Sequence, residues 1–187
     1  MRIVLDPGHG GKDPGAIDPV QPWQGDMLVT REDEIAYDIA LRTRQCLERA
    51  GYTAYLSRSP NQFVSLQGRC DFANRMQADA FISIHINAAS NPEASGIETF
   101  SYPGAIRGAR LRDLVHNGIM RMAPEFRDRG AKEAKHYVTH YTKMPACLVE
   151  CGFCTNLEDE KSIHDPGVRA RIAQGIANGV VMFLGGG

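Results

Sequence analysis

The sequence lacks long apolar runs, an excess of charge of one sign and a dense set of cysteines. No apolar run reaches the roughly 18 residues that a membrane-spanning helix needs. The 21 basic and 22 acidic residues give a formal net charge of −1, so there is neither the basic surface of a nucleic-acid-binding protein nor a basic stripe for an anionic membrane. We therefore expect no nucleic-acid partner and no membrane insertion, and we expect a monomer.

Cysteine is also sparse, and its number is odd. Five cysteines in 187 residues do not form a disulfide framework, which a chain of this length does not need, so we expect mostly buried thiols. The N-terminus lacks the apolar segment of a signal peptide, because Met1 and Arg2 lead directly into the short run 3–5. We expect no export by a signal-peptide route.

What is present is the composition of an ordinary globular domain. Hydrophobic residues make up 43% of the chain and charged residues 23%, close to the averages for such proteins. A chain of this length forms about one domain and buries enough surface for a full core. We predict one domain over 1–184, followed by a flexible glycine tail at 185–187.

Apolar runs and helical patterns alternate along the chain. Strands are predicted at 3–5, 53–56, 80–86, 97–101, 137–140 and 146–150. Helices are predicted after Thr30, after Ser65, over 111–122, after Asn156 and after Asp165, with Gly51 ending the first of them. The alternation indicates an α/β fold with a six-stranded, mostly parallel sheet and helices on both faces.

Polar residues gather where ligands bind in such sheets, at the carboxyl ends of the strands. His9 follows the first strand, His85 ends the third, Glu150 ends the last, and Glu32 lies in the first turn of the first helix. A catalytic zinc takes three protein ligands such as two histidines and a glutamate, and it leaves one position for water. The fourth group would then serve as general base.

Several motifs include or flank these residues: DPGHGGKDPGA at 6–16, TRE at 30–32, FISIHINA at 81–88, DRG at 128–130, MPACLVECGF at 144–153 and NLEDE at 156–160. Together they resemble the motifs of the zinc-dependent N-acetylmuramoyl-L-alanine amidases, the Amidase_3 family. The resemblance runs in order from residue 1 to about residue 184 and so covers nearly the whole chain.

The resemblance implies a role for each of the four residues. The family's zinc ligands fall on His9, Glu32 and His85, and its catalytic glutamate falls on Glu150. Nearby Glu34 should point away from the metal, because helix positions two residues apart face different directions. The family cuts the amide bond between N-acetylmuramic acid and L-alanine in peptidoglycan. Zinc activates a water molecule, and the glutamate transfers its proton to the departing amine.

Four further residues are expected to support the site or to contact the substrate: Asn87, Arg129, His140 and Trp23. His136 and His140 would share one face of the strand predicted there, since they are four residues apart. Trp23 lies in the loop 18–29, where it would stack on the substrate or anchor the loop.

Two other functions compete with this interpretation. Cys151 and Cys154 form a C-x-x-C motif, which suggests a thioredoxin-like dithiol. The nearest helix cap, Asn156, follows both thiols, so neither would gain the low pKa that a helix N-terminus gives. The second alternative is a non-catalytic domain that binds the cell wall.

The resemblance also implies a location. Family members act at the bacterial cell wall as autolysins, sporulation enzymes or phage endolysins. Without a signal peptide, we expect either cytoplasmic synthesis with phage-type release or a precursor whose start has been removed.

Overall fold

The computed structural model describes residues 1–18 and 28–186. Within these ranges the strands are β1 (Arg2–Pro7), β2 (Ile17–Asp18), β3 (Thr30–Arg31), β4 (Thr53–Leu56), β5 (Ala80–Asn87), β6 (Ile97–Ser101), β7 (Asp128–Glu133) and β8 (Ala146–Phe153). The helices are α1 (Glu32–Arg49), α2 (Leu66–Arg75), α3 (Ile106–Met122), α4 (Tyr137–Tyr141), α5 (Leu157–His164) and α6 (Pro166–Gly185). Helix α6 thus includes the first residue of the expected glycine tail.

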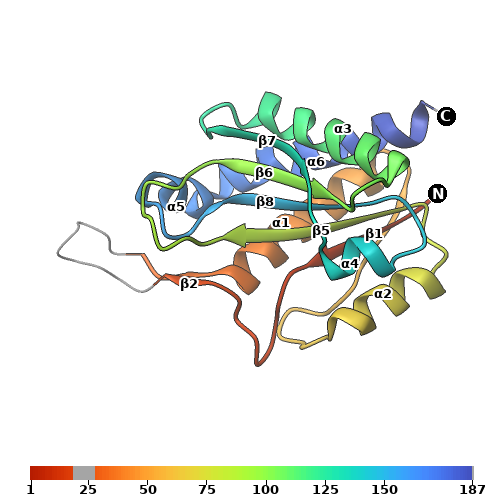
Figure 1. Cartoon of the computed structure of the whole chain (residues 1–187), viewed down its shortest axis with the longest axis horizontal. Coiled ribbons are helices and arrows are strands. Elements are labelled where there is room, and N and C mark those ends of the chain that lie inside the picture. Colours follow the sequence, from red (N-terminus) through yellow and green to blue (C-terminus); the bar gives the residue numbers. More distant parts are fainter. Residues whose placement is uncertain (19–27, 187) are drawn as a thin grey trace.

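A mostly parallel sheet organises the described residues, as predicted (Figure 1). Its six strands follow the order β4-β1-β5-β8-β6-β7. Strands β4, β1, β5 and β8 run parallel, whereas β6 pairs antiparallel with β8 and parallel with β7. The short strands β2 and β3 form a separate antiparallel pair.

The two faces of the sheet carry different layers of helices. Alternate sheet residues such as Leu5 and Ile82 pack against α1, α3 and α6, while Val4 and Phe81 pack against α2 and α4. This alternation follows from the two-residue period of a strand. Among the described residues, no helix has both the length and the hydropathy of a membrane-spanning segment.

Helices α3 and α6 approach each other through glycines. A Cβ atom added at Gly179 in α6 would lie 2.4 Å from Val115 Cα in α3, and one added at Gly118 in α3 would lie 2.3 Å from the Gly175 carbonyl oxygen. The backbones are therefore too close for any side chain at these positions. Helix α6 in this way covers the sheet alongside α1 and α3.

Several predicted helix ends are confirmed. Ser65 accepts a hydrogen bond from the amide of Gly68, and Asn156 and Asp165 cap α5 and α6 in the same way. Gly51 follows the last residues of α1 with φ +86°, the left-handed conformation that commonly ends a helix.

The predicted cap of α1 at Thr30 is wrong. The helix begins at Glu32 with Arg31 as its N-cap residue, and no side chain caps it. The amides of Glu32 and Asp33 instead donate to backbone carbonyls of the preceding loop. Thr30 belongs to β3, and its hydroxyl lies 2.5 Å from Glu160 Oε1. Tertiary partners here replace the local cap.

The predicted strand at 137–140 is also wrong, because this segment forms helix α4. Val138 and Thr139 are buried, and Val138 packs with the α2 side of the sheet. This packing outweighs the strand preference of β-branched residues, which depends strongly on context.

The sixth strand of the sheet is β7, which the sequence did not predict because DRGAKE lacks apolar alternation. Charged residues of this kind are typical of edge strands.

Candidate metal centre

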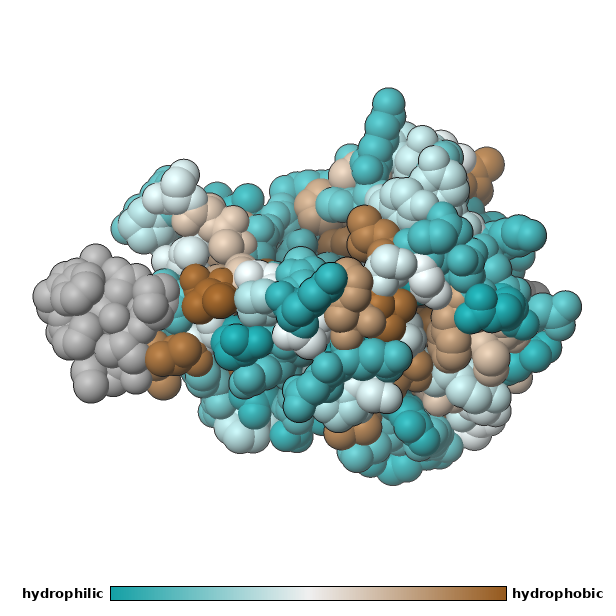
Figure 2. All heavy atoms as spheres, turned by 90° about the horizontal axis from the view of Figure 1, so that it is seen from below, coloured by the Kyte–Doolittle hydropathy of each residue, from teal (hydrophilic) through white to brown (hydrophobic). Residues whose placement is uncertain are grey.

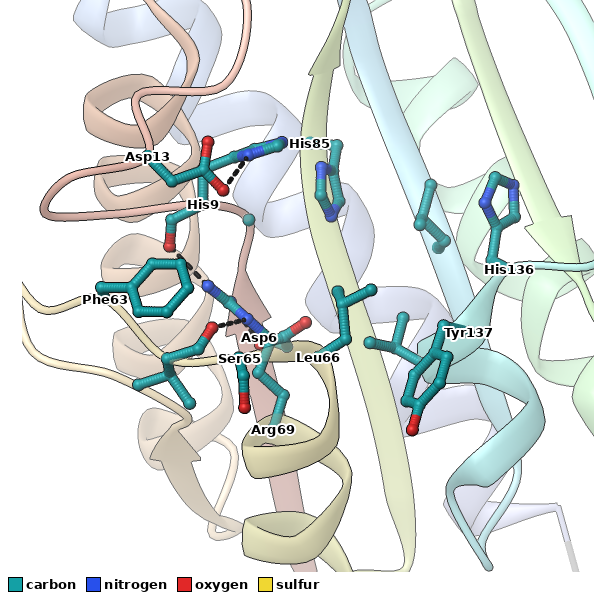
Figure 3. Close-up of a pocket in the computed structure, with 14 residues that line it drawn as sticks. Asp6, His9, Asp13, Phe63, Ser65, Leu66, Arg69, His85, His136 and Tyr137 are labelled. Carbon is teal, nitrogen blue, oxygen red and sulfur yellow. Dashed lines mark hydrogen bonds and ion pairs between the residues drawn. The ribbon is translucent and has the colours of Figure 1, made fainter.

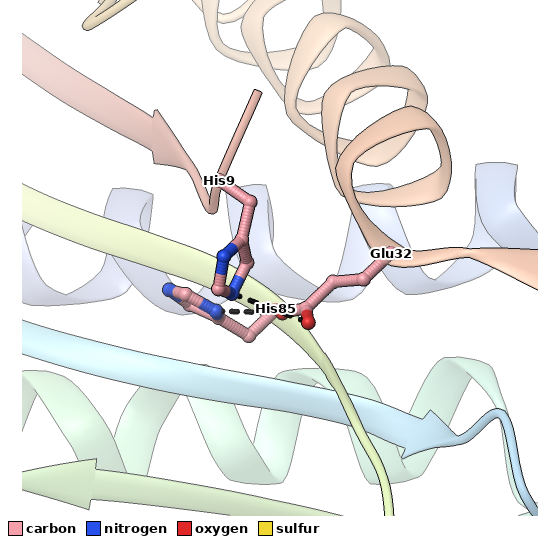
Figure 4. Close-up of side chains that lie close together, drawn as sticks. All are labelled: His9, Glu32 and His85. Atoms are coloured by element: carbon pink, nitrogen blue, oxygen red, sulfur yellow. Dashed lines mark hydrogen bonds and ion pairs between the residues drawn. The ribbon is translucent and has the colours of Figure 1, made fainter. Parts of the chain in front are cut away.

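Three of the predicted residues lie together at the carboxyl ends of β1 and β5. His9, Glu32 and His85 each offer a ligand atom, and these atoms lie within 4.8 Å of one another. His9 Nε2 is 3.2 Å from Glu32 Oε2, and His85 Nδ1 is 2.8 Å from Glu32 Oε1 (Figure 4). Glu34 is outside this group, since its side chain is 68% exposed and pairs with Arg31.

The backbone around the group leaves room for the imidazoles only because two positions are glycine. A Cβ atom at Gly8 would lie 2.4 Å from His85 Cε1, and one at Gly15 would lie 2.4 Å from Glu32 Oε2. Contacts this short are excluded for carbon and oxygen atoms in close packing. The glycines of the loop after β1 therefore form part of the site.

Each imidazole has its second nitrogen held by another side chain. His9 Nδ1 is 3.0 Å from Asp13 Oδ2, and His85 Nε2 is 3.1 Å from Ser83 Oγ. The opposite nitrogens both face Glu32. Histidines that bind metals commonly use one nitrogen for the ion and the other for such a partner.

The electrostatics of the group favour a positive charge between these side chains. The Glu32 hydrogen bond is the main cause that raises the pKa of His9 to about 9. Burial tends to raise the pKa of Glu32, but hydrogen bonds from His85 and His9 outweigh it and hold that pKa well below its usual range. Either protons or a cation supplies this charge, and the two compete for the same nitrogen atoms.

Glu150 lies beside this group on the next strand. In the strand register it is opposite His85 of β5 and opposite Glu98 of β6. Its Oε2 atom is buried without a hydrogen-bond partner, and burial raises the pKa of Glu150 to about 7. A carboxylate with a free acceptor atom and a pKa near neutrality suits proton transfer.

A cavity of about 400 Å³ opens next to His9 and His85. Its walls are mainly apolar, with Phe63, Leu66 and Val138 among them. Figure 3 shows these walls coming from the loop before α2, from α2 itself and from α4. In the space-filling view, hydrophobic atoms lie near the middle of the face and at several places toward its edges, among mostly hydrophilic atoms (Figure 2). Apolar walls with a few convergent polar groups are typical of ligand sites.

Two of the other predicted residues meet at Glu98, the register partner of Glu150. Asn87 Nδ2 donates to Glu98 Oε1 over 2.8 Å, and Arg129 Nε lies 3.2 Å from Glu98 Oε2. Lys132, which sequence reasoning missed, lies 2.5 Å from the same oxygen. Lys132 lies on strand β7, which the sequence did not predict, so nothing in the sequence indicated that Lys132 lies beside Glu98.

The remaining predictions do not join the group. His140 is exposed on α4, and its ring stacks on Tyr102 with centroids 4.2 Å apart. Its neighbour His136 lines the cavity instead, with Nε2 buried and without a hydrogen-bond partner. His136 is the N-cap residue of α4, so a helix prediction for this segment would have placed it at the start of the helix. Trp23 lies outside the described residues.

The C-x-x-C motif does not have the features of a redox dithiol. Both Cys151 and Cys154 are buried free thiols. Burial raises the pKa of Cys154 to about 12 and raises that of Cys151 further. Reactive thiols need the opposite shift, so the thioredoxin-like alternative is not favoured.

Comparisons with known proteins agree on one family. A family model described as N-acetylmuramoyl-L-alanine amidase (Amidase_3) matches residues 3–182. The amidase LytC of Bacillus subtilis is 38% identical over 97% of this chain, which spans 35% of that protein. The amidase CwlM of Bacillus licheniformis is 37% identical over 96% of this chain, which spans 67% of that protein.

Solved structures show the same fold over nearly the whole chain. The amidase AmiC2 of Nostoc punctiforme has a TM-score of 0.88 at 36% identity and covers 99% of this chain and 97% of its own. The catalytic domain of the amidase CwlV from Bacillus (Paenibacillus) polymyxa var. colistinus has a TM-score of 0.89 at 29% identity, with 98% of each chain covered.

Proposed function

The chain belongs to the N-acetylmuramoyl-L-alanine amidase family Amidase_3, and from that premise we propose that it is a peptidoglycan hydrolase. It cuts the amide bond between N-acetylmuramic acid and the L-alanine of the stem peptide. The observation that carries this proposal is the convergence of His9, Glu32 and His85 beside Glu150 at one edge of the sheet. Residues 1–184 form the catalytic domain.

The donor set fits a zinc ion. Two imidazole nitrogens and one carboxylate are the ligands of many catalytic zinc sites, and the outer nitrogen of each histidine already has a partner. His9, Glu32 and His85 would hold the ion. It would polarise the amide carbonyl and make a water molecule more acidic.

Glu150 performs the proton transfers. Its free Oε2 atom accepts the proton of the attacking water, and the pKa near 7 suits both uptake and release of that proton at neutral pH. The same carboxyl group then donates to the nitrogen of L-alanine. An amine leaves readily only when it is protonated, so this second transfer completes the cleavage.

The residues around Glu98 support this edge of the site. Asn87, Arg129 and Lys132 together hold the Glu98 carboxylate, whose strand position is opposite Glu150. The two cations exceed the single negative charge of Glu98, and the side chains of Arg129 and Lys132 are 27% and 41% exposed. They present positive charge to the carboxylates of a stem peptide.

The location follows from the substrate. A peptidoglycan amidase acts at the cell wall. One relative, which is 31% identical to this chain, has the name probable cell wall amidase LytH of Staphylococcus aureus. We also propose that the protein acts as a monomer, with His9, Glu32, His85 and Glu150 gathered within a single chain.

The variant Glu150→Gln tests the proposal. We expect zinc content to stay at the wild-type level while release of dye from labelled cell walls falls by about 10²–10⁴-fold, the usual contribution of a general acid–base. Glu34→Gln is the matched control, because its exposed side chain lies close in sequence to Glu32 but away from the group. It should retain full activity.

Mass spectrometry of the digest identifies the bond that is cut. Free muramic acid lactyl groups and stem peptides beginning with L-alanine are the expected products. Undiminished hydrolysis by Glu150→Gln, or products from another bond, would contradict the proposal.

A further inference from the structure

A buried network of hydrogen bonds lies beneath His85, centred on Asp6 of β1. Asp6 is the register partner of Ser83 across β1 and β5, and Ser83 Oγ donates to Asp6 Oδ2 over 2.8 Å. Because strand side chains alternate, Ser83 and His85 lie on the same face of β5. Ser83 Oγ is thus also within 3.1 Å of His85 Nε2.

The other partners of Asp6 are all donors. Its Oδ1 atom accepts from Arg69 Nη1 over 2.8 Å and from Ser57 Oγ over 2.5 Å. All four residues of the network, Asp6, Ser57, Arg69 and Ser83, are at most 7% exposed. A carboxylate paired with a buried guanidinium acts only as an acceptor, so it fixes the direction of the Ser83 hydroxyl.

That direction decides which nitrogen of His85 carries a proton. A serine hydroxyl has one hydrogen to donate, and here it points at Asp6. The lone pairs of Ser83 Oγ are then left for His85, which must donate through Nε2–H. In a neutral imidazole the other nitrogen, Nδ1, has no proton, and Nδ1 is the atom that faces Glu32.

We propose that Ser83, oriented by Asp6, is a positioning residue that keeps the proton of His85 on Nε2 and leaves Nδ1 free to bind the metal ion. The inference rests on the metal centre proposed above. Arg69 extends the network to the second histidine, because its Nη2 also donates to the carbonyl oxygen of His9 over 2.5 Å. The buried guanidinium therefore holds the His9 segment directly (Figure 3) and is linked to His85 through Asp6 and Ser83.

Two serines on the same carboxylate provide a matched pair of variants. Ser57 and Ser83 are both buried and both donate to Asp6, but only Ser83 contacts His85. Removing a partner of a metal-binding histidine typically lowers metal affinity by about 10–100-fold. We therefore expect Ser83→Ala to lower zinc affinity by this amount and Ser57→Ala to change it by less than about twofold.

Zinc affinity is measured on the metal-free proteins by competition with a chromophoric chelator. The absorption spectrum of the cobalt-substituted proteins gives a second measure, since it reports ligand geometry independently of hydrolysis. The spectrum of Ser83→Ala should differ from those of wild type and Ser57→Ala. Equal zinc affinities and equal spectra for the two variants would overturn the inference.

Nuclear magnetic resonance on the wild-type protein tests the inference even if Ser83→Ala fails to fold. Long-range proton–nitrogen correlations in the zinc-loaded protein distinguish the two imidazole tautomers. A proton on Nε2 of His85 is expected, and a proton on Nδ1 would overturn the inference. A wild-type protein that takes up neither zinc nor cobalt would instead reject the metal centre itself.

Discussion

The close packing of Gly8 against His85 makes a single methyl group a sharp test of the metal centre. In Gly8→Ala the new Cβ atom would lie 2.4 Å from His85 Cε1 and 2.5 Å from His85 Nδ1. Carbon atoms in contact prefer about 3.5 Å, so the ring must move by about 1 Å. The new Cβ atom would also lie 2.9 Å from His85 Nε2, so the ring edge that contacts both Glu32 and Ser83 would be displaced.

The size of the effect follows from this displacement. Metal–ligand distances are held to within about 0.2 Å, so a shift of about 1 Å removes His85 from effective coordination. We expect a loss of zinc affinity of about 100-fold, equivalent to about 2.8 kcal/mol. At a zinc concentration 100 times the wild-type dissociation constant, stabilisation by the ion would fall from about 2.7 to about 0.4 kcal/mol.

Thermal unfolding with and without zinc measures this difference. For a chain of this size, about 2.7 kcal/mol raises the melting temperature by roughly 5–11 °C, and the variant should show a rise of about 1 °C. Gly185→Ala is the control, because it adds the same methyl group at an exposed helix end where nothing lies within 4 Å. Its zinc-dependent rise should match the wild type.

A folded Gly8→Ala protein with the wild-type rise in melting temperature would refute this reasoning. It would mean either that the ion does not bind through His85 or that the loop after β1 moves freely enough to accept a side chain.

Other parts of the structure give predictions that are independent of the metal. A thiol reagent at pH 8 should label Cys46 in the native protein and the other four cysteines only after denaturation, because these four are buried. Burial raises the pKa of Cys154, for example, to about 12, so its reactive thiolate would form only at higher pH. Rapid labelling of all five would contradict the buried arrangement. Gly179→Ala should lower the free energy of unfolding by about 1–3 kcal/mol, because the added methyl group clashes with Val115. Its zinc affinity, measured by chelator competition, should be unchanged. An unchanged melting temperature would show that α3 and α6 separate easily.

The fold was largely predictable because its main signals are local. Caps such as Ser65 and Asn156 act within three residues. The apolar runs of β1 and β8 are continuous, and isoleucines alternate along β5. Helix α4 and strand β7 escaped prediction because tertiary contacts decide their conformation. Val138 becomes helical through its packing beside α2, and the charged β7 segment becomes a strand only by pairing with β6.

The residues brought together at the candidate site were predictable for a similar reason. His9, His85 and Glu150 each follow or end an apolar run, and the family motifs fixed the choice of Glu32. The supporting network was not predictable, because it depends on register. Asp6 and Ser83 are 77 residues apart and meet only through the pairing of β1 with β5. Such partners are visible only once the strands are aligned.

The position of α6 in the chain has a consequence for synthesis. This helix follows every strand of the sheet in chain order, yet it packs beside α1 and α3 on one face of that sheet. While the ribosome is still translating residues 166–185, the apolar face that α6 covers has no partner. Exposed apolar surface on incomplete chains promotes aggregation. The nascent chain therefore exposes this apolar face until helix α6 has been synthesised and has packed against α1 and α3.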